Sequence, residues 1–137
     1  MFDSLITTGA VNVDFVFSRK MRLCLASDFR QVFNQTEIKV SCKQLLILAR
    51  RNNRQYPRLG LIVAKKHIHM ATARNRTKRY IRETFRIHQD KLDSLDVVVL
   101  IRKGAKELSG TEMYQLLNCQ WQRLNRYSQT AFRSDKG

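Results

Sequence analysis

The segment Leu95–Ile101, with the sequence LDVVVLI, restricts the possible folds of this chain more than any other feature. It is a run of apolar, mostly β-branched residues that is bounded by turn residues. Strands that are covered on both faces of a sheet have this composition. The segment therefore predicts an interior strand, with neighbouring strands at its edges and helices over the sheet.

Apolar patterns elsewhere in the chain predict the elements around this strand. We expect strands at residues 38–40, 45–50 and 59–64, and helices from residue 26, over 70–88 and from residue 109 onward. Ser27 is the expected N-cap of the first helix, and Ser109 with Glu112 forms a capping box for the last. The order α-β-β-β-α-β-α predicts an α+β fold, a two-layer α/β sandwich with helices packed on one sheet.

The length of 137 residues suits one domain with a modest core. We expect this domain over residues 21–127, after a flexible N-terminal arm (1–20) and before a flexible C-terminal tail (128–137). No apolar run approaches the roughly 18 residues of a transmembrane helix, and the N-terminus lacks the basic region of a signal peptide. The predicted location is the cytoplasm, without a membrane partner.

The charge balance indicates a polyanionic partner. Lys and Arg number 26 against 11 Asp and Glu, which gives a formal net charge of +15. Charge alone also fits a membrane surface or a heparin-like polymer, and nucleic acid is one of several candidates at this point.

The basic residues concentrate in the segment 65–86, which holds eight Lys or Arg and one carboxylate, Glu83. At about 100° per residue on a helix, one side is formed by Thr77, Ile81, Thr84 and Phe85. A second side is formed by Asn75, Arg79, Arg82 and Arg86, with Lys78 at its border. Arg outnumbers Lys here, which favours bidentate contacts with phosphate. We expect an RNA-binding face, with only Arg79 and Glu83 placed to form an ion pair.

Two aromatic residues and two lysines are further candidates for nucleic-acid binding. Phe29 and Phe33 lie one turn apart on the first predicted helix, either as core residues or as a stacking surface for unpaired bases. Lys65 and Lys66 end the third predicted strand and extend the basic surface to the sheet edge. The sequence alone leaves both interpretations of the phenylalanines open.

The acidic residues do not predict a nuclease site. Hydrolysis by two metal ions needs several carboxylates in one pocket. Asp90, Asp93 and Asp96 lie close together in the sequence, but we interpret them as solvated residues of the turn before a strand. The histidines His67 and His69 lie in a strongly basic segment without nearby carboxylates, which disfavours a metal site. We therefore predict no catalytic residue and no metal site on the protein itself.

Three motifs, taken in order, resemble a known family. They are LASDFRQVF (25–33), RLGLIVAKK followed after seven residues by RNRTKRYIRETFR (58–86), and DVVVLIRKGA (96–105). Together they resemble the protein subunit of bacterial ribonuclease P over about residues 17–126. The combination is specific, whereas the RNR tripeptide at 74–76 alone is weak.

This resemblance implies a fold like domain 2 of ribosomal protein S5, with a left-handed βαβ crossover, although about 98% of such crossovers are right-handed. It also implies an endoribonuclease that removes the 5′ leader of precursor tRNA. A catalytic RNA subunit with bound Mg²⁺ does the chemistry, and the protein is an accessory subunit, about one per RNA, that strengthens binding and broadens substrate use. The implied RNA-subunit contacts are Arg74, Asn75, Arg76, Lys78, Arg79 and Arg82, and Arg86 shares their helix face. The implied leader cleft contains Phe29, Phe33, Lys65 and Lys66.

Two other classes of protein share some of these features. A non-enzymatic RNA-binding protein, such as a ribosomal protein or an assembly factor, has the same charge and fold, and only the family motif separates it from a ribonuclease P subunit. A DNA-binding protein with the Arg-rich helix in a major groove ranks lower. The segment before residue 70 predicts a strand, whereas a helix-turn-helix motif requires a helix there.

Overall fold

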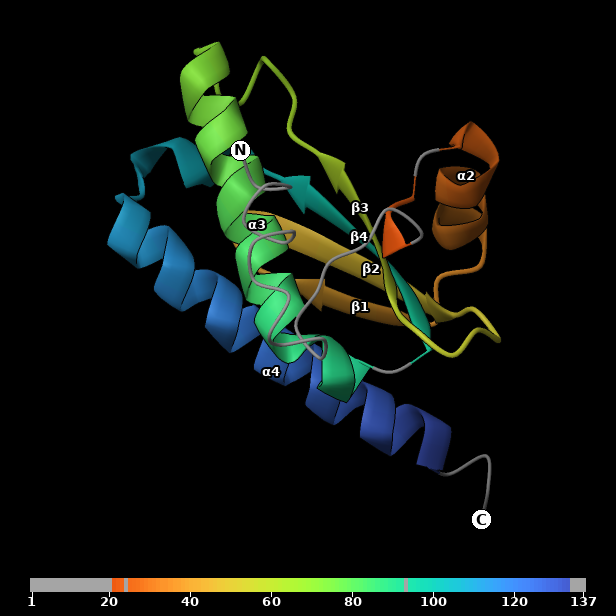
Figure 1. The fold of residues 1–137 in the computed structure, drawn as a ribbon. Coiled ribbons are helices and arrows are strands. Elements are labelled where there is room, and N and C mark those ends of the chain that lie inside the picture. The colour runs from red at the N-terminus through yellow and green to blue at the C-terminus, as the bar shows by residue number, and fades with distance from the viewer. Residues whose placement is uncertain (1–20, 24, 93, 134–137) are drawn as a thin grey trace, which may run out of the picture.

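The computed structural model describes residues 21–133 except Cys24 and Asp93 (Figure 1). Its elements, in order, are α2 (Ala26–Asn34), β1 (Ile38–Ser41), β2 (Leu45–Arg51), β3 (Arg58–Ile62), α3 (Ala71–Leu92), β4 (Leu95–Ile101), the 3₁₀ helix η3 (Lys103–Glu107) and α4 (Gly110–Arg133). The predicted order α-β-β-β-α-β-α is confirmed. The predicted arm at 1–20 lies outside the described residues, and α4 continues past residue 127, where we expected the domain to end.

The four strands form one mixed sheet in the order β1-β2-β4-β3. The strand β4 is interior, as its composition predicts, and pairs antiparallel with β2 and parallel with β3. Val98 at its centre lies opposite Leu48 on one side and Gly60 on the other. Because β3 and β4 are parallel neighbours, α3 is the crossover between them. The left hand of this crossover and the likeness to ribosomal protein S5 stay predictions.

The main core lies between the sheet and the helices α3 and α4, which cover one of its faces (Figure 1). Phe85 of α3 and Trp121 of α4 are fully buried there and meet edge to face, with ring centroids 5.6 Å apart. The indole Nε1 of Trp121 donates a hydrogen bond of 2.8 Å to the hydroxyl of Thr84, so the two helices are also joined by a polar contact. These contacts fix the rotation of α3 about its axis, and with it the residues that face outward.

Among the described helices, only α2 lies on the opposite face of the sheet (Figure 1). Val32 is fully buried there against Leu23, Leu48 and Val98. The two-layer description therefore applies to the sheet with α3 and α4, and α2 adds a partial third layer. This division gives the molecule two faces with different chemistry.

The ends of α2, α4 and β3 differ in how well they match the sequence predictions. The N-cap of α2 is Leu25 and not Ser27, because the carbonyl of Leu25 already accepts the backbone N–H of Asp28 at 3.0 Å. The capping box is confirmed: the N–H of Ser109 donates to Glu112 Oε1 at 2.8 Å, and the N–H of Glu112 donates to Ser109 Oγ at 3.1 Å. The strand β3 ends at Ile62, so Lys65 and Lys66 lie in the following turn and do not end the strand.

Candidate RNA interface

The buried side of α3 is the one that the helical wheel predicts. Thr77, Ile81, Thr84 and Phe85 are all buried. The hydroxyls of Thr77 and Thr84 donate to the carbonyls of Ala73 and Tyr80, each at 2.9 Å, so their burial leaves no donor unsatisfied. The basic residues on the other side of α3 are thereby held toward the surface.

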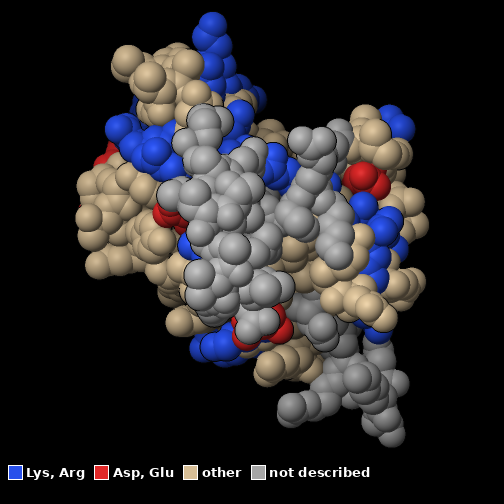
Figure 2. Space-filling model, viewed as in Figure 1, with Lys and Arg blue, Asp and Glu red and all other residues tan. Residues whose placement is uncertain are grey.

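The outward side of α3 carries a dense group of basic and amide side chains, which we call the α3 face: Asn75, Arg76, Lys78, Arg79, Arg82 and Arg86. Asn75, Arg76 and Arg79 are exposed, and the other three are half-buried. Figure 2 shows Lys and Arg side chains gathered around the end of the molecule where α3 begins. These side chains therefore form a largely basic surface along α3.

Glu83, the one acidic residue of the segment 65–86, does not form an ion pair with Arg79. This finding is contrary to the prediction from their spacing. The Arg79 guanidinium instead lies 6.0 Å from the centre of the Tyr80 ring. Glu83 faces Tyr114 of α4, whose pKa is raised by burial and by the neighbouring Glu83 carboxylate. Arg79 therefore has no ion-pair partner among the described residues.

Arg74 has a different role from the rest of the predicted RNA contacts. Its Nη1 atom donates to the carbonyl oxygens of Ile68 at 3.1 Å and His69 at 2.7 Å. The side chain therefore ties the turn that contains Lys65 and Lys66 to the first turn of α3. Both lysines are exposed.

The sheet face that α2 covers, which we call the α2 face, contains the two predicted stacking residues. Phe29 is half-buried and lies directly over Gly60, where an added Cβ would come within 2.6 Å of the ring atom Cε1. Phe33 is 40% exposed. Leu46, Leu100 and Ile62, which are cross-strand neighbours, are only partly buried and belong with Phe29 to the same apolar cluster. The face therefore combines an exposed ring on α2 with partly buried apolar side chains on the strands.

A buried ion pair under α2 is the feature that sequence reasoning missed. Arg58 Nε and Nη2 donate to Asp96 Oδ1 at 2.8 Å and Oδ2 at 2.6 Å. Asn52 adds a hydrogen bond of 2.9 Å to Oδ1, and Asp28 of α2 lies 3.7 Å from Arg58 Nη2. The hydrogen bond with Asp96 raises the pKa of Arg58. The network thus joins α2 to β3 and β4.

The interpretation of Asp96 as a solvated turn residue is wrong. The side chain is fully buried within β4, because alternation along the strand turns it toward the α2 face, where Arg58 is its cross-strand partner. Asp90 is exposed on α3, and Asp93 lies outside the described residues. The position of Asp96 inside a strand was the available signal, since a carboxylate there needs a partner.

Neither a cluster of metal ligands nor a membrane-spanning helix is present in the described residues. No group of three or more His, Cys, Asp or Glu side chains lies close enough to hold a metal ion. In that same part of the chain, no helix combines the length and the hydropathy needed to cross a bilayer. The fold and the α3 face define an RNA-binding α+β protein.

Comparison with known proteins narrows the class of RNA-binding α+β protein to one family. The family model described as Ribonuclease P matches residues 17–125. The ribonuclease P protein component of Azotobacter vinelandii is 46% identical over 110 residues, which cover 80% of this chain and 85% of the relative. That of Vibrio cholerae is 45% identical over 114 residues, which cover 83% of this chain and 96% of the relative.

Solved structures give the same result. The RNase P protein of Staphylococcus aureus superposes with a TM-score of 0.69 at 27% identity, covering 74% of this chain and 93% of that one. The RNase P protein of Thermotoga maritima superposes with a TM-score of 0.61 at 32% identity, covering 74% and 96%. The chain therefore belongs to the ribonuclease P protein family. As a member, it is a component of an endoribonuclease and takes part in 5′ processing of precursor tRNA.

Proposed function

We propose that the protein holds two RNAs on opposite sides of its sheet. The α3 face binds the catalytic RNA subunit, with about one protein per RNA. The α2 face binds the single-stranded 5′ leader of precursor tRNA. The observation that carries this proposal is the division of the surface into a guanidinium-rich helix on one side and an exposed aromatic ring beside apolar strands on the other.

The α3 face suits a folded RNA. Its charges lie on a rigid helix whose opposite side is locked into the core, so they need little ordering on binding. Each phosphate that a basic side chain neutralises releases counterions, with a slope of log affinity against log salt of about −0.7 to −0.9 per contact. Asn75 adds a donor and an acceptor for a base edge or a 2′-hydroxyl. Arg74 contributes its charge and also holds the carbonyls of Ile68 and His69, which follow the turn with Lys65 and Lys66.

The α2 face suits an unpaired strand. Base stacking on an aromatic side chain contributes about 1–3 kcal/mol per base and accepts any sequence. Phe33 is the exposed ring, and Phe29 is held over Gly60 as its support. Lys65 and Lys66, in the turn after β3, are available for the phosphates of the same strand. A leader bound in this way strengthens substrate binding and broadens substrate use.

The chemistry stays with the RNA subunit in this proposal. Hydrolysis assisted by Mg²⁺ needs carboxylate or phosphate oxygens around the ion. The buried carboxylate of Asp96 is occupied by Arg58 and Asn52, and Glu83 lies among basic side chains. The Mg²⁺ ions are therefore held mainly by RNA. The protein works in the cytoplasm, and neither DNA nor a membrane is its partner.

Reconstituted cleavage tests this proposal. A 5′-labelled precursor tRNA is incubated at low Mg²⁺ with a bacterial ribonuclease P RNA, with this protein, and with both. We expect cleavage at the mature 5′ end only with both components. RNA binding without stimulation would favour a non-enzymatic RNA-binding protein, and cleavage by the protein alone would contradict the assignment of the chemistry to RNA.

The double variant Arg79→Ala/Arg82→Ala tests the α3 face separately. Removing these two guanidinium groups should weaken binding of the RNA subunit, and it should make the salt slope shallower by about 0.7–0.9 for each phosphate that is no longer neutralised. The variant Arg54→Ala/Arg126→Ala removes the same charge from exposed positions outside the face. Equal slopes in the two double variants would remove the α3 face from the proposal.

A further inference from the structure

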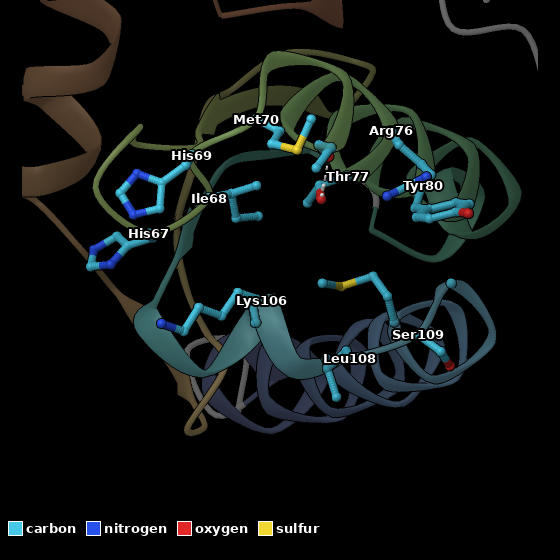
Figure 3. Close-up of a pocket in the computed structure, with 14 residues that line it drawn as sticks. His67, Ile68, His69, Met70, Arg76, Thr77, Tyr80, Lys106, Leu108 and Ser109 are labelled. Carbon is cyan, nitrogen blue, oxygen red and sulfur yellow. Dashed lines mark hydrogen bonds between the residues drawn. The ribbon is translucent and has the colours of Figure 1, made fainter.

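A cavity of about 510 Å³ opens beside the start of α3. Its walls come from the segment 67–70, the first half of α3, the segment from η3 to residue 109, and the first turn of α4 (Figure 3). Ligand sites for small molecules measure roughly 300–1,000 Å³. The cavity is therefore large enough for a ligand of that class, and none of the roles proposed above uses it.

The lining combines an apolar floor with a rim of two histidines, one arginine and one lysine. Ile68, Ala105 and Met113 are buried and form the floor. The rim carries His67, His69, Arg76 and Lys106, and none of the described residues that line the cavity is a carboxylate. In Figure 3 the two histidines lie at one side of the opening, Arg76 at the other, and Lys106 below. This arrangement suits a ligand with one apolar, flat part and one anionic part.

Tyr80 gives the cavity an aromatic wall in a fixed position. Its ring packs edge to face against Tyr114 of α4, with centroids 5.9 Å apart. Its hydroxyl lies so close to Gly110 that a Cβ at that position would come within 2.6 Å of it. The ring is thus set by α4 before any ligand arrives. Figure 3 shows Arg76 beside it on the same wall.

We propose that this cavity binds one unpaired nucleotide of the RNA subunit. The base lies against the apolar floor and Tyr80, beside Arg76, and the phosphate lies across the opening, near Lys106. Proteins commonly recognise an unpaired RNA base that has left its stack and now stacks on an aromatic ring or on an arginine guanidinium group. The inference rests on the proposed docking of the RNA subunit on the α3 face, because Arg76 belongs to both that face and the rim.

Two lysines of one short helix provide a matched comparison. Lys103 and Lys106 are both exposed on η3, but only Lys106 lines the cavity. Lys106→Ala should weaken binding of the RNA subunit by roughly fivefold through loss of a charge-assisted phosphate contact, whereas Lys103→Ala should change it little. Ala73→Leu adds apolar volume to the cavity without changing any charge, and it should weaken binding as well.

The free protein can be tested with ¹³C-methyl-methionine NMR. Met70 and Met113 line the cavity, and Met21 is a buried reference in the main core. The probes are the four ribonucleoside 5′-monophosphates and, separately, inorganic phosphate. We expect at least one nucleotide to shift the Met113 and Met70 signals more than phosphate does and to leave Met21 unchanged. Lys106→Ala, but not Lys103→Ala, should reduce this response.

Three results would overturn the inference: no shift with any nucleotide, equal shifts with inorganic phosphate, or equal effects of the two lysine variants on RNA binding. Near-native thermal unfolding of each variant checks that it folds. Failure here is distinguishable from failure of the proposed function. If Arg79→Ala/Arg82→Ala weakens RNA binding while the cavity tests fail, the docking face stands without the nucleotide site. If that double variant binds normally, the docking face itself is wrong.

Discussion

The two sides of the sheet are built in different ways. The α3 face consists of residues that are close in sequence on one helix. Residues three and four positions apart share a helix side, so these side chains reach the surface while Thr77, Ile81, Thr84 and Phe85 are buried on the other side. The α2 face is assembled from α2, β2, β3 and β4, and its parts are joined by the Arg58–Asp96 pair and by the contact of Phe29 with Gly60.

This difference predicts how each side responds to substitution. Single changes on the α3 face should alter RNA affinity and leave folding intact, since the side chains point away from the core. Single changes under α2 should alter stability first, and substrate binding as a consequence. The predictions below test this contrast from the largest expected effect to the smallest.

The largest effect is expected from Asp96→Ala. Removing one partner of a buried ion pair leaves the other charge unpaired, which typically costs about 3–5 kcal/mol of unfolding free energy. Urea denaturation measures this loss, and Asp90→Ala on the exposed side of α3 is the control. Arg58→Met combined with Asp96→Leu should regain part of the stability, because no buried charge is left unpaired. A loss below about 1 kcal/mol for Asp96→Ala would place the pair among ordinary surface ion pairs.

Gly60→Ala should have the next largest effect. The new Cβ would lie 2.6 Å from Cε1 and 2.7 Å from Cζ of Phe29, so the ring has to move. Overpacking of this kind typically costs about 1–3 kcal/mol. We expect a lower melting temperature and weaker binding of precursor tRNA with a long leader, with unchanged affinity for the RNA subunit. Adding Phe29→Leu should restore stability, and a lack of rescue would show that the ring does not determine the cost.

Phe33→Ala should weaken substrate binding without lowering the stability of the fold. Because Phe33 is 40% exposed, its truncation should leave the melting temperature almost unchanged. Loss of one base stack of about 1–3 kcal/mol should weaken binding of a precursor with a long leader by roughly tenfold. Ile87→Ala, an exposed apolar residue on α3, is the control. Equal weakening with a one-nucleotide leader would argue against a leader contact.

The smallest loss of stability is expected from Glu37→Gln, at the edge of the sheet beside β1. Burial acts to raise the pKa of Glu37, but hydrogen bonds from the Arg51 backbone and side chain outweigh it and lower this pKa below 4.5. The pair therefore stabilises the fold above pH 4.5, and the contribution is lost as the pH falls through the lowered pKa. Glu37→Gln should cost less than about 1 kcal/mol at pH 7. Its difference from the parent protein should disappear in denaturation at acidic pH, and a difference that grows there would have the wrong sign.

Much of the fold and of the α3 face could be predicted, because both depend on local periodicity. The strand β4 has the predicted bounds, and the four residues expected on the buried side of α3 are all buried. The capping box at Ser109 is also a local pattern, since its two side chains lie within one turn. Such features need no knowledge of the rest of the chain.

The remaining features depend on contacts between residues that are distant in sequence. The burial of Asp96 follows from Arg58 on the neighbouring strand, and the different exposures of Phe29 and Phe33 follow from Gly60. The role of Arg74 in holding the preceding turn depends on carbonyl groups, which any residue provides. The cavity beside Tyr80 joins four separate segments, and Lys106 in it belongs to the short helix η3.

Site-specific photo-crosslinking tests the central claim, two RNAs on two faces, most directly. A p-benzoylphenylalanine replaces Phe33 in one variant and Arg79 in another, and each is assembled with the RNA subunit and a labelled precursor tRNA. Crosslinks from position 33 should map to the 5′ leader, and crosslinks from position 79 should map to the RNA subunit. Crosslinks from both positions to the same RNA would contradict the account.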